Sequence, residues 1–330
     1  MRVVVVGGTG NISVSIVERL LSQGHDVTCY NRGQKGQVPD GAQLITGDRK
    51  NRAEFESAMQ QGKFDVAIDM ICFDKADAES DIRAFAGVQQ FIQCSSVMSY
   101  GKPDVWLPVT EDHPIQPDTP YGAGKAEADH AFMSAFYSDN FPATIIKPST
   151  THGPIRGLVR QASRDTQWID RVRKGKPLVV CGNGRQTIQF LHVKDAALGF
   201  VGVIGKSRCI GQTYNLVDEG FTYWDVFHHT AMDVLGREVE LVGVPLDDLI
   251  ALGVPNFGTC KDAYSHNNYF SSEKMMRDVP EFRPQMTLRD AMEDIIAVMD
   301  AEGRVDNSDD VRWEDQVIAA QRRVRETKID

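Results

Sequence analysis

The sequence predicts an α/β protein built on a doubly wound parallel sheet, and three observations lead to this fold class. Short β-branched runs alternate with amphipathic helical patterns through the first half of the chain, as expected of parallel strands joined by helical crossovers. A glycine-rich turn follows the first run, between Val6 and Ser13. The length of 330 residues exceeds that of one typical core. We therefore expect a Rossmann sheet followed by a smaller C-terminal α/β cap.

Each predicted strand of the first half is a short apolar run. The runs cover residues 2–6, 26–30, 42–46, 64–70, 90–95 and 143–147. Between them, apolar residues recur at helical spacing, as Ile12, Ile16 and Leu20 do, and these segments supply the crossover helices.

The pattern loosens beyond Pro148 into joints rich in Gly and Pro. Helices are expected at residues 157–174, 194–204, 222–235, 287–301 and 310–327. Strand-like segments within 188–217 are expected to return to the first sheet. The first domain is therefore predicted to contain 1–150 and about 188–217, and the cap to contain 151–187 and 218–330.

Composition and charge exclude several classes of protein. Hydrophobic residues at 42% and charged residues at 25% are typical of globular chains, which excludes wholesale disorder, collagen and coiled coil. The net charge of -10 repels polyanions, so nucleic acid is not an expected partner.

The six cysteines are widely spaced, which indicates reduced thiols in a cytoplasmic protein and no metal site. The chain shows neither a signal-peptide pattern nor an apolar run long enough for a membrane helix, so we expect no membrane association.

The turn after the first strand has the pattern of a phosphate-binding loop. Glycine allows a sharp turn and lets backbone N–H groups and a helix N-terminus approach a pyrophosphate. Ser13 stands where a third glycine is usual, and its side chain is small enough to fit. The cofactor contacts predicted in this turn are Gly7, Thr9, Gly10, Asn11 and Ile12.

The end of the second strand bears on the choice of cofactor. A dinucleotide fold that selects NAD places an acidic residue there, against the ribose 2′-hydroxyl. This chain has Asn31 and Arg32 instead, and an arginine can accept a 2′-phosphate. The sequence therefore favours NADP over NAD, although Arg32 could also be a solvated turn residue.

A proton-transfer site is predicted around Tyr121, which is the only one of eight tyrosines followed four residues later by Lys. This spacing places Tyr121 and Lys125 on one face of a helix. A phenol is a poor base at neutral pH, but a neighbouring ammonium favours the phenolate. Ser96 follows the apolar strand ending at Cys94, at the strand edge where open α/β sheets bind ligands. The three residues together predict general acid–base chemistry.

These motifs, in this order, resemble the extended short-chain dehydrogenase/reductase superfamily, of the NAD(P)-dependent epimerase/dehydratase type. The matching landmarks are GGTGNIS, Gly47-Asp48-Arg49, SSVMSYG, TPYGAGK, Lys147-Pro148, His152-Gly153-Pro154 and FLHVKDAA. The resemblance implies an NAD(P)-dependent oxidoreductase or epimerase. Its substrate would be a small molecule, a sugar or sugar nucleotide that exchanges hydride at a hydroxyl or keto carbon.

The resemblance also implies residue roles. Tyr121 would be the acid/base, with Lys125 and Ser96 as its partners. Tyr121 and Lys125 would also contact the cofactor, where Lys125 reaches the ribose. Asp48 would lie near the adenine and Pro148 near the nicotinamide. The further cofactor contacts that it implies are Arg49, Met70 and Ile71. The implied substrate contacts are Val97, Met98, Thr151, His152 and Gln189. Because the helix that begins near Tyr121 often pairs with its copy in relatives, a homodimer is expected.

Departures from the family pattern keep other functions open. Dehydratases usually carry Asp-Glu after the hydroxyl residue, where this chain has Val97 and Met98, so a dehydratase is not expected. The arginine that grips the diphosphate in sugar-nucleotide epimerases is missing before Phe190, so an NADPH-dependent reductase of a non-nucleotide carbonyl compound is an alternative. Asn31-Arg32-Gly33 and Gln189 are closest to a branch that includes chloroplast stem-loop RNA-binding proteins, so a catalytically silent RNA-binding module is another.

Overall fold

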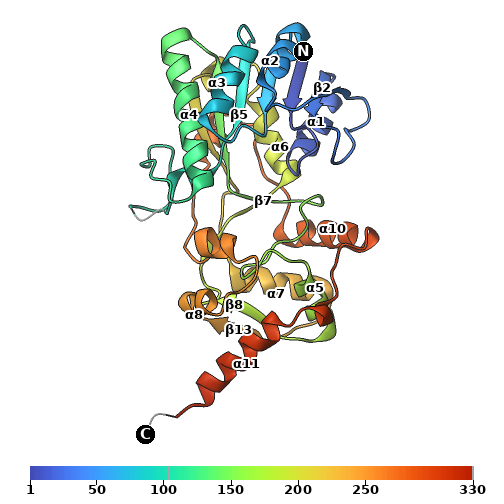
Figure 1. Cartoon of the computed structure of the whole chain (residues 1–330), viewed down its shortest axis with the longest axis vertical. Coiled ribbons are helices and arrows are strands. Elements are labelled where there is room, and N and C mark those ends of the chain that lie inside the picture. Colours follow the sequence, from blue (N-terminus) through green and yellow to red (C-terminus); the bar gives the residue numbers. More distant parts are fainter. Residues whose placement is uncertain (103–104, 329–330) are drawn as a thin grey trace. The chain divides into compact units, whose positions relative to one another are not determined.

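A computed structural model describes residues 1–102 and 105–328 and divides the chain into two compact units (Figure 1). The first unit contains Met1–Thr151, Leu191–Glu219 and Phe270–Gln285. The second contains His152–Phe190, Gly220–Tyr269 and the chain from Met286 onward. That the first unit binds NAD(P) and the second binds substrate stays a prediction.

Seven parallel strands form the sheet of the first unit, in the order β11-β6-β5-β4-β1-β2-β3. Their bounds are β1 (Arg2–Val6), β2 (Asp26–Asn31), β3 (Gln43–Thr46), β4 (Val66–Asp69), β5 (Gln90–Cys94), β6 (Ala143–Pro148) and β11 (Gln212–Leu216). The strand order runs outward in both directions from β1, which places a ligand crevice at the carboxyl ends of the central strands. The predicted α/β class with a parallel sheet is confirmed.

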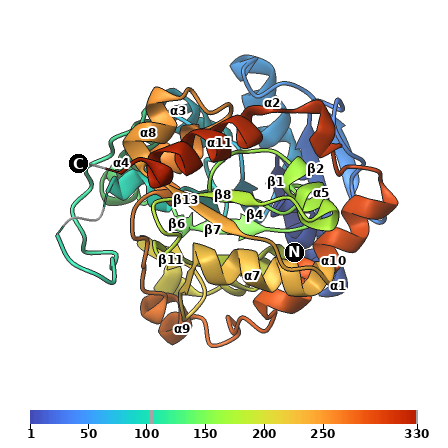
Figure 2. The same cartoon turned by 90° about the horizontal axis from the view of Figure 1, so that it is seen from below.

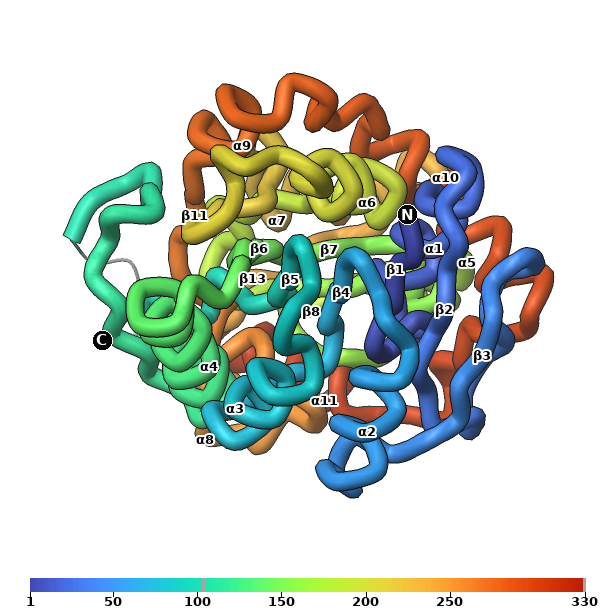
Figure 3. The backbone as a smooth tube through the Cα atoms, turned by 90° about the horizontal axis from the view of Figure 1, so that it is seen from above, coloured from blue at the N-terminus to red at the C-terminus, as the bar shows by residue number. Residues whose placement is uncertain are grey.

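Helices cover both faces of this sheet (Figure 3). One face carries α1 (Ser13–Ser22) and α6 (Val193–Gly202), and the other carries α2 (Arg52–Gly62), α3 (Lys75–Ala84) and α4 (Pro120–Asp139). The four valines of β1 alternate between two apolar cores: Val3 and Val5 face the α1 side, whereas Val4 and Val6 face the α3 side. Burial on both faces explains why β1 is a continuous apolar run. No helix within the described residues is both long and apolar enough to cross a membrane.

The second unit is built around two short parallel strands, β8 (Leu178–Cys181) and β13 (Leu241–Val244) (Figure 2). Leu178 joins an apolar cluster with α5 (Gln167–Lys174), α7 (Trp224–Leu235) and α10 (Leu288–Ala301). Val179 and Cys181 point the other way and pack with α8 (Leu246–Ala251) and α11 (Trp313–Glu326). The remaining elements are β7 (Thr150–His152), β9 (Thr187–Ile188), β10 (Phe190–His192), β12 (Thr222–Tyr223), α9 (Glu273–Asp278) and the short turns η1 (Val97–Tyr100), η2 (Ser207–Cys209), η3 (Cys260–Tyr264) and η4 (Ser308–Asp310).

Two details differ from the sequence expectations. The helix predicted over 157–174 begins only at Gln167, because Gly157 has a φ of 78° and bridges back to Gly153. Within the non-helical part, the buried Arg160 donates to Glu314 at 2.8 Å and to the carbonyl of Val179 at 3.1 Å. The segment Phe270–Gln285, placed in the predicted cap, belongs to the first unit, where Met275, Val279 and Phe282 join the core beside α6.

Candidate active site

Two glycines of the turn after β1 lie against side chains that leave no room for a Cβ atom. Gly7 has a φ of 83°, and a Cβ atom there would lie 2.7 Å from Cγ2 of Ile71. Gly8 is equally restricted, because a Cβ atom there would lie 2.5 Å from the sulfur of Cys29. The turn leads into α1, whose first residue, Ser13, is buried.

Asn31 braces this turn. Its Oδ1 accepts the N–H of Gly8 at 2.8 Å, and its Nδ2 donates to Oγ1 of Thr9 at 3.3 Å. The side chain of Asn31 therefore ties the end of β2 to the turn. Arg32, the next residue, and Lys35 are left to face a ligand.

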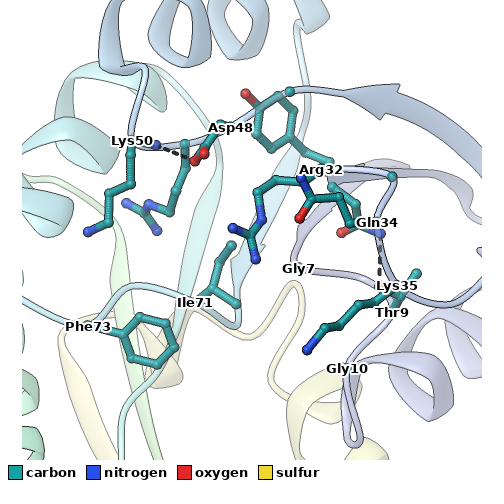
Figure 4. A pocket seen from close by; sticks show the side chains of 15 residues that line it. Gly7, Thr9, Gly10, Arg32, Gln34, Lys35, Asp48, Lys50, Ile71 and Phe73 are labelled. Carbon is teal, nitrogen blue, oxygen red and sulfur yellow. Dashed lines mark hydrogen bonds between the residues drawn. The ribbon is translucent and has the colours of Figure 1, made fainter.

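A pocket of about 350 Å³ opens at this edge of the sheet (Figure 4). Its lining combines the turn, the residues after β2 and β3, and the segment after β4: Gly7, Thr9, Gly10, Tyr30, Asn31, Arg32, Gly33, Gln34, Lys35, Gly47, Asp48, Arg49, Lys50, Ile71 and Phe73. The side chains of Arg32 and Lys35 extend into it (Figure 4). Among the described residues neither of the two forms an ion pair, so the pocket presents two uncommitted cations to an anionic ligand.

Arg49 forms part of the pocket wall, but its guanidinium serves the protein itself. It is buried and pairs with Asp69, with Asp81 at 3.1 Å and with Asp77 at 3.7 Å. Asp69 in turn accepts the N–H of Ile71 at 2.6 Å. The Arg49 network therefore fixes the segment that follows β4, and a direct contact of the Arg49 guanidinium with cofactor stays a prediction.

Burial and charge shift the carboxylates of this network in opposite directions. Burial and the neighbouring Asp69 charge raise the pKa of Asp81 well above its usual range, although Arg49 opposes them. Burial also disfavours ionised Asp77, but the Lys50 hydrogen bond and the Arg49 charge outweigh it and lower that pKa. The network thus holds Asp77 ionised beside the pocket.

Tyr121 and Lys125 begin α4, as predicted. Thr119 caps the helix by accepting the N–H of Gly122 at 3.0 Å. Lys125 is 1% exposed, and its Nζ donates to the carbonyl oxygens of Cys72 and Cys94 at 2.7 Å each. The same nitrogen lies 5.8 Å from the centre of the Tyr121 ring. Lys125 therefore joins the ends of β4 and β5 to the helix that carries Tyr121.

Ser96 caps the turn η1 that follows β5. Its Oγ accepts the N–H of Met98 at 3.2 Å, and its carbonyl accepts the hydroxyl of Ser99 at 2.8 Å. A Cβ atom on Gly122 would overlap the carbonyl oxygen of Met98, and one on Gly124 would overlap that of Phe73. These two glycines let α4 approach both η1 and the segment after β4. Their role was missed in the sequence, although both stand inside the TPYGAGK motif.

A second buried ion pair lies beneath η1. Lys147 on β6 pairs with Asp129, two helical turns beyond Tyr121, and donates to Oγ of Ser99 at 2.5 Å. Ser95 also donates to Asp129, at 2.7 Å. This pair ties β6, α4 and the turn carrying Ser96 into one buried polar network.

The other predicted contact residues are placed as follows. Ile71 lines the pocket. Val97 and Met98 lie in η1, next to Ser96. Asn11, Ile12, Met70, Pro148 and Thr151 belong to the first unit, whereas His152 and Gln189 belong to the second, where they are 2% and 1% exposed. Contacts of these residues with cofactor or substrate stay predictions. No group of three or more His, Cys, Asp or Glu side chains in the described part of the chain could hold a metal ion.

The residues around the pocket fit a nicotinamide dinucleotide. The turn has no side-chain atoms at Gly7 and Gly10 to block a pyrophosphate, and α1 begins directly behind it. Arg32 and Lys35 add positive charge beside it.

The chain is similar in sequence to proteins with different names. The chain is 27% identical over 248 residues to 2'-dehydrokanamycin reductase of Streptomyces kanamyceticus, with 75% of this chain and 70% of the reductase covered. It is 25% identical over 311 residues to chloroplast stem-loop binding protein of 41 kDa b from Arabidopsis thaliana, with 89% and 78% covered.

Solved structures show the same fold. UDP-glucuronic acid 4-epimerase from Bacillus cereus, solved in complex with NAD, superposes with a TM-score of 0.73 at 17% identity, covering 92% of this chain and 99% of the epimerase. The family model described as NAD dependent epimerase/dehydratase family matches residues 3–216, more than half of the chain. The protein is therefore an NAD(P)-dependent enzyme of the short-chain dehydrogenase/reductase type and belongs to the NAD dependent epimerase/dehydratase family.

Proposed function

We propose that this enzyme moves hydride between NADP(H) and a hydroxyl or keto carbon of a sugar or sugar nucleotide, with Tyr121 transferring the proton. The observation that carries the proposal is the 5.8 Å distance from the Lys125 ammonium to the centre of the Tyr121 ring, in the same unit as the cationic nucleotide pocket. The relatives named as a reductase and as a UDP-sugar epimerase support the substrate class.

The residues divide the work between binding and proton transfer. The glycine turn would bind the pyrophosphate, and Arg32 with Lys35 would bind a 2′-phosphate. When bound, the nicotinamide ring supplies or accepts the hydride. In the reducing direction, the O–H of Tyr121 gives its proton to the substrate oxygen, while the Ser96 hydroxyl donates a hydrogen bond to that oxygen. The Lys125 ammonium stabilises the phenolate left on Tyr121. In the oxidising direction the proton returns to Tyr121.

A reductase is the second candidate within this chemistry. Neither of the two positions before the FLHV segment carries the arginine found in many sugar-nucleotide epimerases: Ile188 is 2% exposed in the core of the second unit, and Gln189 is neutral. The Streptomyces relative is named as a reductase. Both observations favour reduction of a carbonyl substrate that lacks a nucleotide.

We expect NADPH to bind more tightly than NADH. The guanidinium of Arg32 and the ammonium of Lys35 can each form a charge-assisted hydrogen bond with the 2′-phosphate, which NADH lacks. Replacing both cations, as Arg32→Ala with Lys35→Ala, should remove most of the preference by weakening NADPH alone. Nucleotide fluorescence titration measures both dissociation constants.

Lys102→Ala serves as the charge control, because it removes a cation of the same unit that does not line the pocket. Equal or tighter binding of NADH to the unmodified protein would overturn the NADP assignment. A protein that bound neither nucleotide but retarded structured RNA at low salt would support the RNA-binding module.

A homodimer through α4 is also expected. Tyr137, near the end of α4, is 78% exposed, so its ring is accessible to a partner helix. Light scattering should give twice the mass of one chain, and Tyr137→Glu should shift the equilibrium toward the monomer. A monomeric mass for the unmodified protein at micromolar concentration would contradict this expectation.

A further inference from the structure

Phe73 stands at the boundary between the nucleotide pocket and Lys125. It follows β4, lines the pocket and is 46% exposed, which is high for a phenylalanine. Lys125, by contrast, is 1% exposed, so no ligand atom can reach its ammonium unless a neighbouring group moves.

The surroundings of the Lys125 ammonium identify that group. An ammonium has three N–H donors, and two of them are used by the carbonyl oxygens of Cys72 and Cys94. The remaining sides are covered by two rings, with the Phe73 centroid at 4.7 Å and the Tyr121 centroid at 5.8 Å. Of these two rings, only Phe73 lines the nucleotide pocket, so it is the ring that a nucleotide bound there can meet.

The backbone of Phe73 is fixed, so only its side chain can yield. Its N–H donates to Oδ2 of Asp77 at 3.2 Å, within the buried Arg49 network. Its carbonyl packs against α4 at Gly124, where a side chain would not fit. The residue before it, Cys72, is bonded to Lys125 itself.

We propose that the ring of Phe73 is a displaceable cover over Lys125 and is a specificity-determining residue of the pocket. A nucleotide that contains only the adenine-bearing ribose and its phosphates would leave the cover in place. A dinucleotide whose second ribose binds Lys125 must turn the ring away and replace its cation–π contact. Phe73 thereby makes Lys125 available only to the longer ligand. The proposal rests on the proposed function in one respect, the identity of that ligand.

Because the covered state competes with binding, removing the ring should improve affinity for the longer ligand. We expect Phe73→Ala to tighten NADPH binding about two- to tenfold, the range of a partly desolvated cation–π contact. Adenosine 2′,5′-bisphosphate, which lacks the second ribose, should bind the variant and the unmodified protein equally. In a Lys125→Met background, Phe73→Ala should no longer tighten NADPH binding.

Calorimetry measures the dissociation constants of NADPH and adenosine 2′,5′-bisphosphate for four proteins. These are the unmodified protein, Phe73→Ala, Lys125→Met and the double variant. Phe221→Ala is the matched control, since Phe221 is also 46% exposed but belongs to the second unit. Weaker NADPH binding by Phe73→Ala, or an equal change for both ligands, would show that the ring is an ordinary contact surface and would overturn the proposal.

A second measurement does not depend on any nucleotide. Labelling of Lys125 by acetic anhydride, followed by peptide mass spectrometry, should be several-fold faster in Phe73→Ala than in the unmodified protein. The exposed Lys75 provides the internal reference for reagent activity. Faster labelling, together with no binding of NADPH or of adenosine 2′,5′-bisphosphate, would support the role of Phe73 as a cover but reject the proposed NADP-dependent function. Unchanged labelling would reject the cover, whatever the function.

Discussion

Replacing Tyr121 by Phe is expected to reduce turnover at least about a hundredfold, the usual contribution of a general acid or base. The variant keeps the ring that lies beside Lys125 and loses only the hydroxyl that exchanges a proton with the substrate oxygen. Tyr121 does not line the nucleotide pocket, and the variant keeps its ring, so the dissociation constant of NADPH should change far less than the turnover. The expected signature is therefore a loss confined to catalysis.

The measurement is the initial rate of NADPH oxidation with carbonyl compounds drawn from a panel of keto-sugars and sugar nucleotides. Tyr137→Phe is the control, because Tyr137 lies on the same helix with 78% of its surface exposed. Full activity of the Tyr121 variant would reject the acid/base assignment, even if the cofactor binds as expected.

Replacing Arg49 by Met is expected to lower the free energy of unfolding by about 3–5 kcal/mol at neutral pH, the cost of breaking a buried ion pair. The change leaves Asp69, Asp77 and Asp81 facing one another without the cation that lies among them. Methionine fills a similar volume, so the loss reports charge rather than a cavity. Because the network holds the segment after β4, NADPH binding should weaken as well.

The destabilisation should also depend on pH in a defined direction. The pKa of Asp81 is already raised by burial and by Asp69, while Arg49 opposes that rise. In the variant the folded state therefore binds more protons than the unfolded state, between the usual pKa of an aspartate and the raised folded value. Stability then falls as pH rises through this window. The loss caused by Arg49→Met should be smaller at about pH 5 than at about pH 8.

Urea denaturation of the variant and the unmodified protein at both pH values tests this expectation. Arg83→Met is the control, since Arg83 pairs with Glu56 on the surface, where an ion pair contributes at most about 1 kcal/mol. A loss below that amount at neutral pH, or a loss that grows as the pH falls, would contradict the account of the network.

The sheet could be predicted because its signal is local. Burial on both faces makes each strand a run of apolar residues, and the glycines after β1 mark the turn regardless of what surrounds it. Helix periodicity and strand order likewise suffice to predict that Tyr121, Lys125 and Ser96 lie near one sheet edge. Their roles in proton transfer stay predictions.

What could not be predicted depends on residues distant in the sequence. The ion pairs of Arg49 with Asp69 and Asp81 join residues that no local pattern relates. The hydrogen bonds of the Asn31 amide with Gly8 and Thr9 likewise appear only once β2 lies beside the turn. The helical pattern of residues 157–166 is overridden by Gly157 and by the Arg160–Glu314 pair, which joins positions far apart in the chain.

The alternation of β1 between two cores also constrains how this protein can evolve. Each of its valines faces only one of the two cores, so exchange for another apolar residue of similar size changes one interface at a time. An inserted or deleted residue would instead send every later valine to the wrong side and shift the glycine turn by one position. We therefore expect evolution at β1 to exchange one apolar residue for another, while insertions and deletions in the strand are selected against because they would also displace the turn.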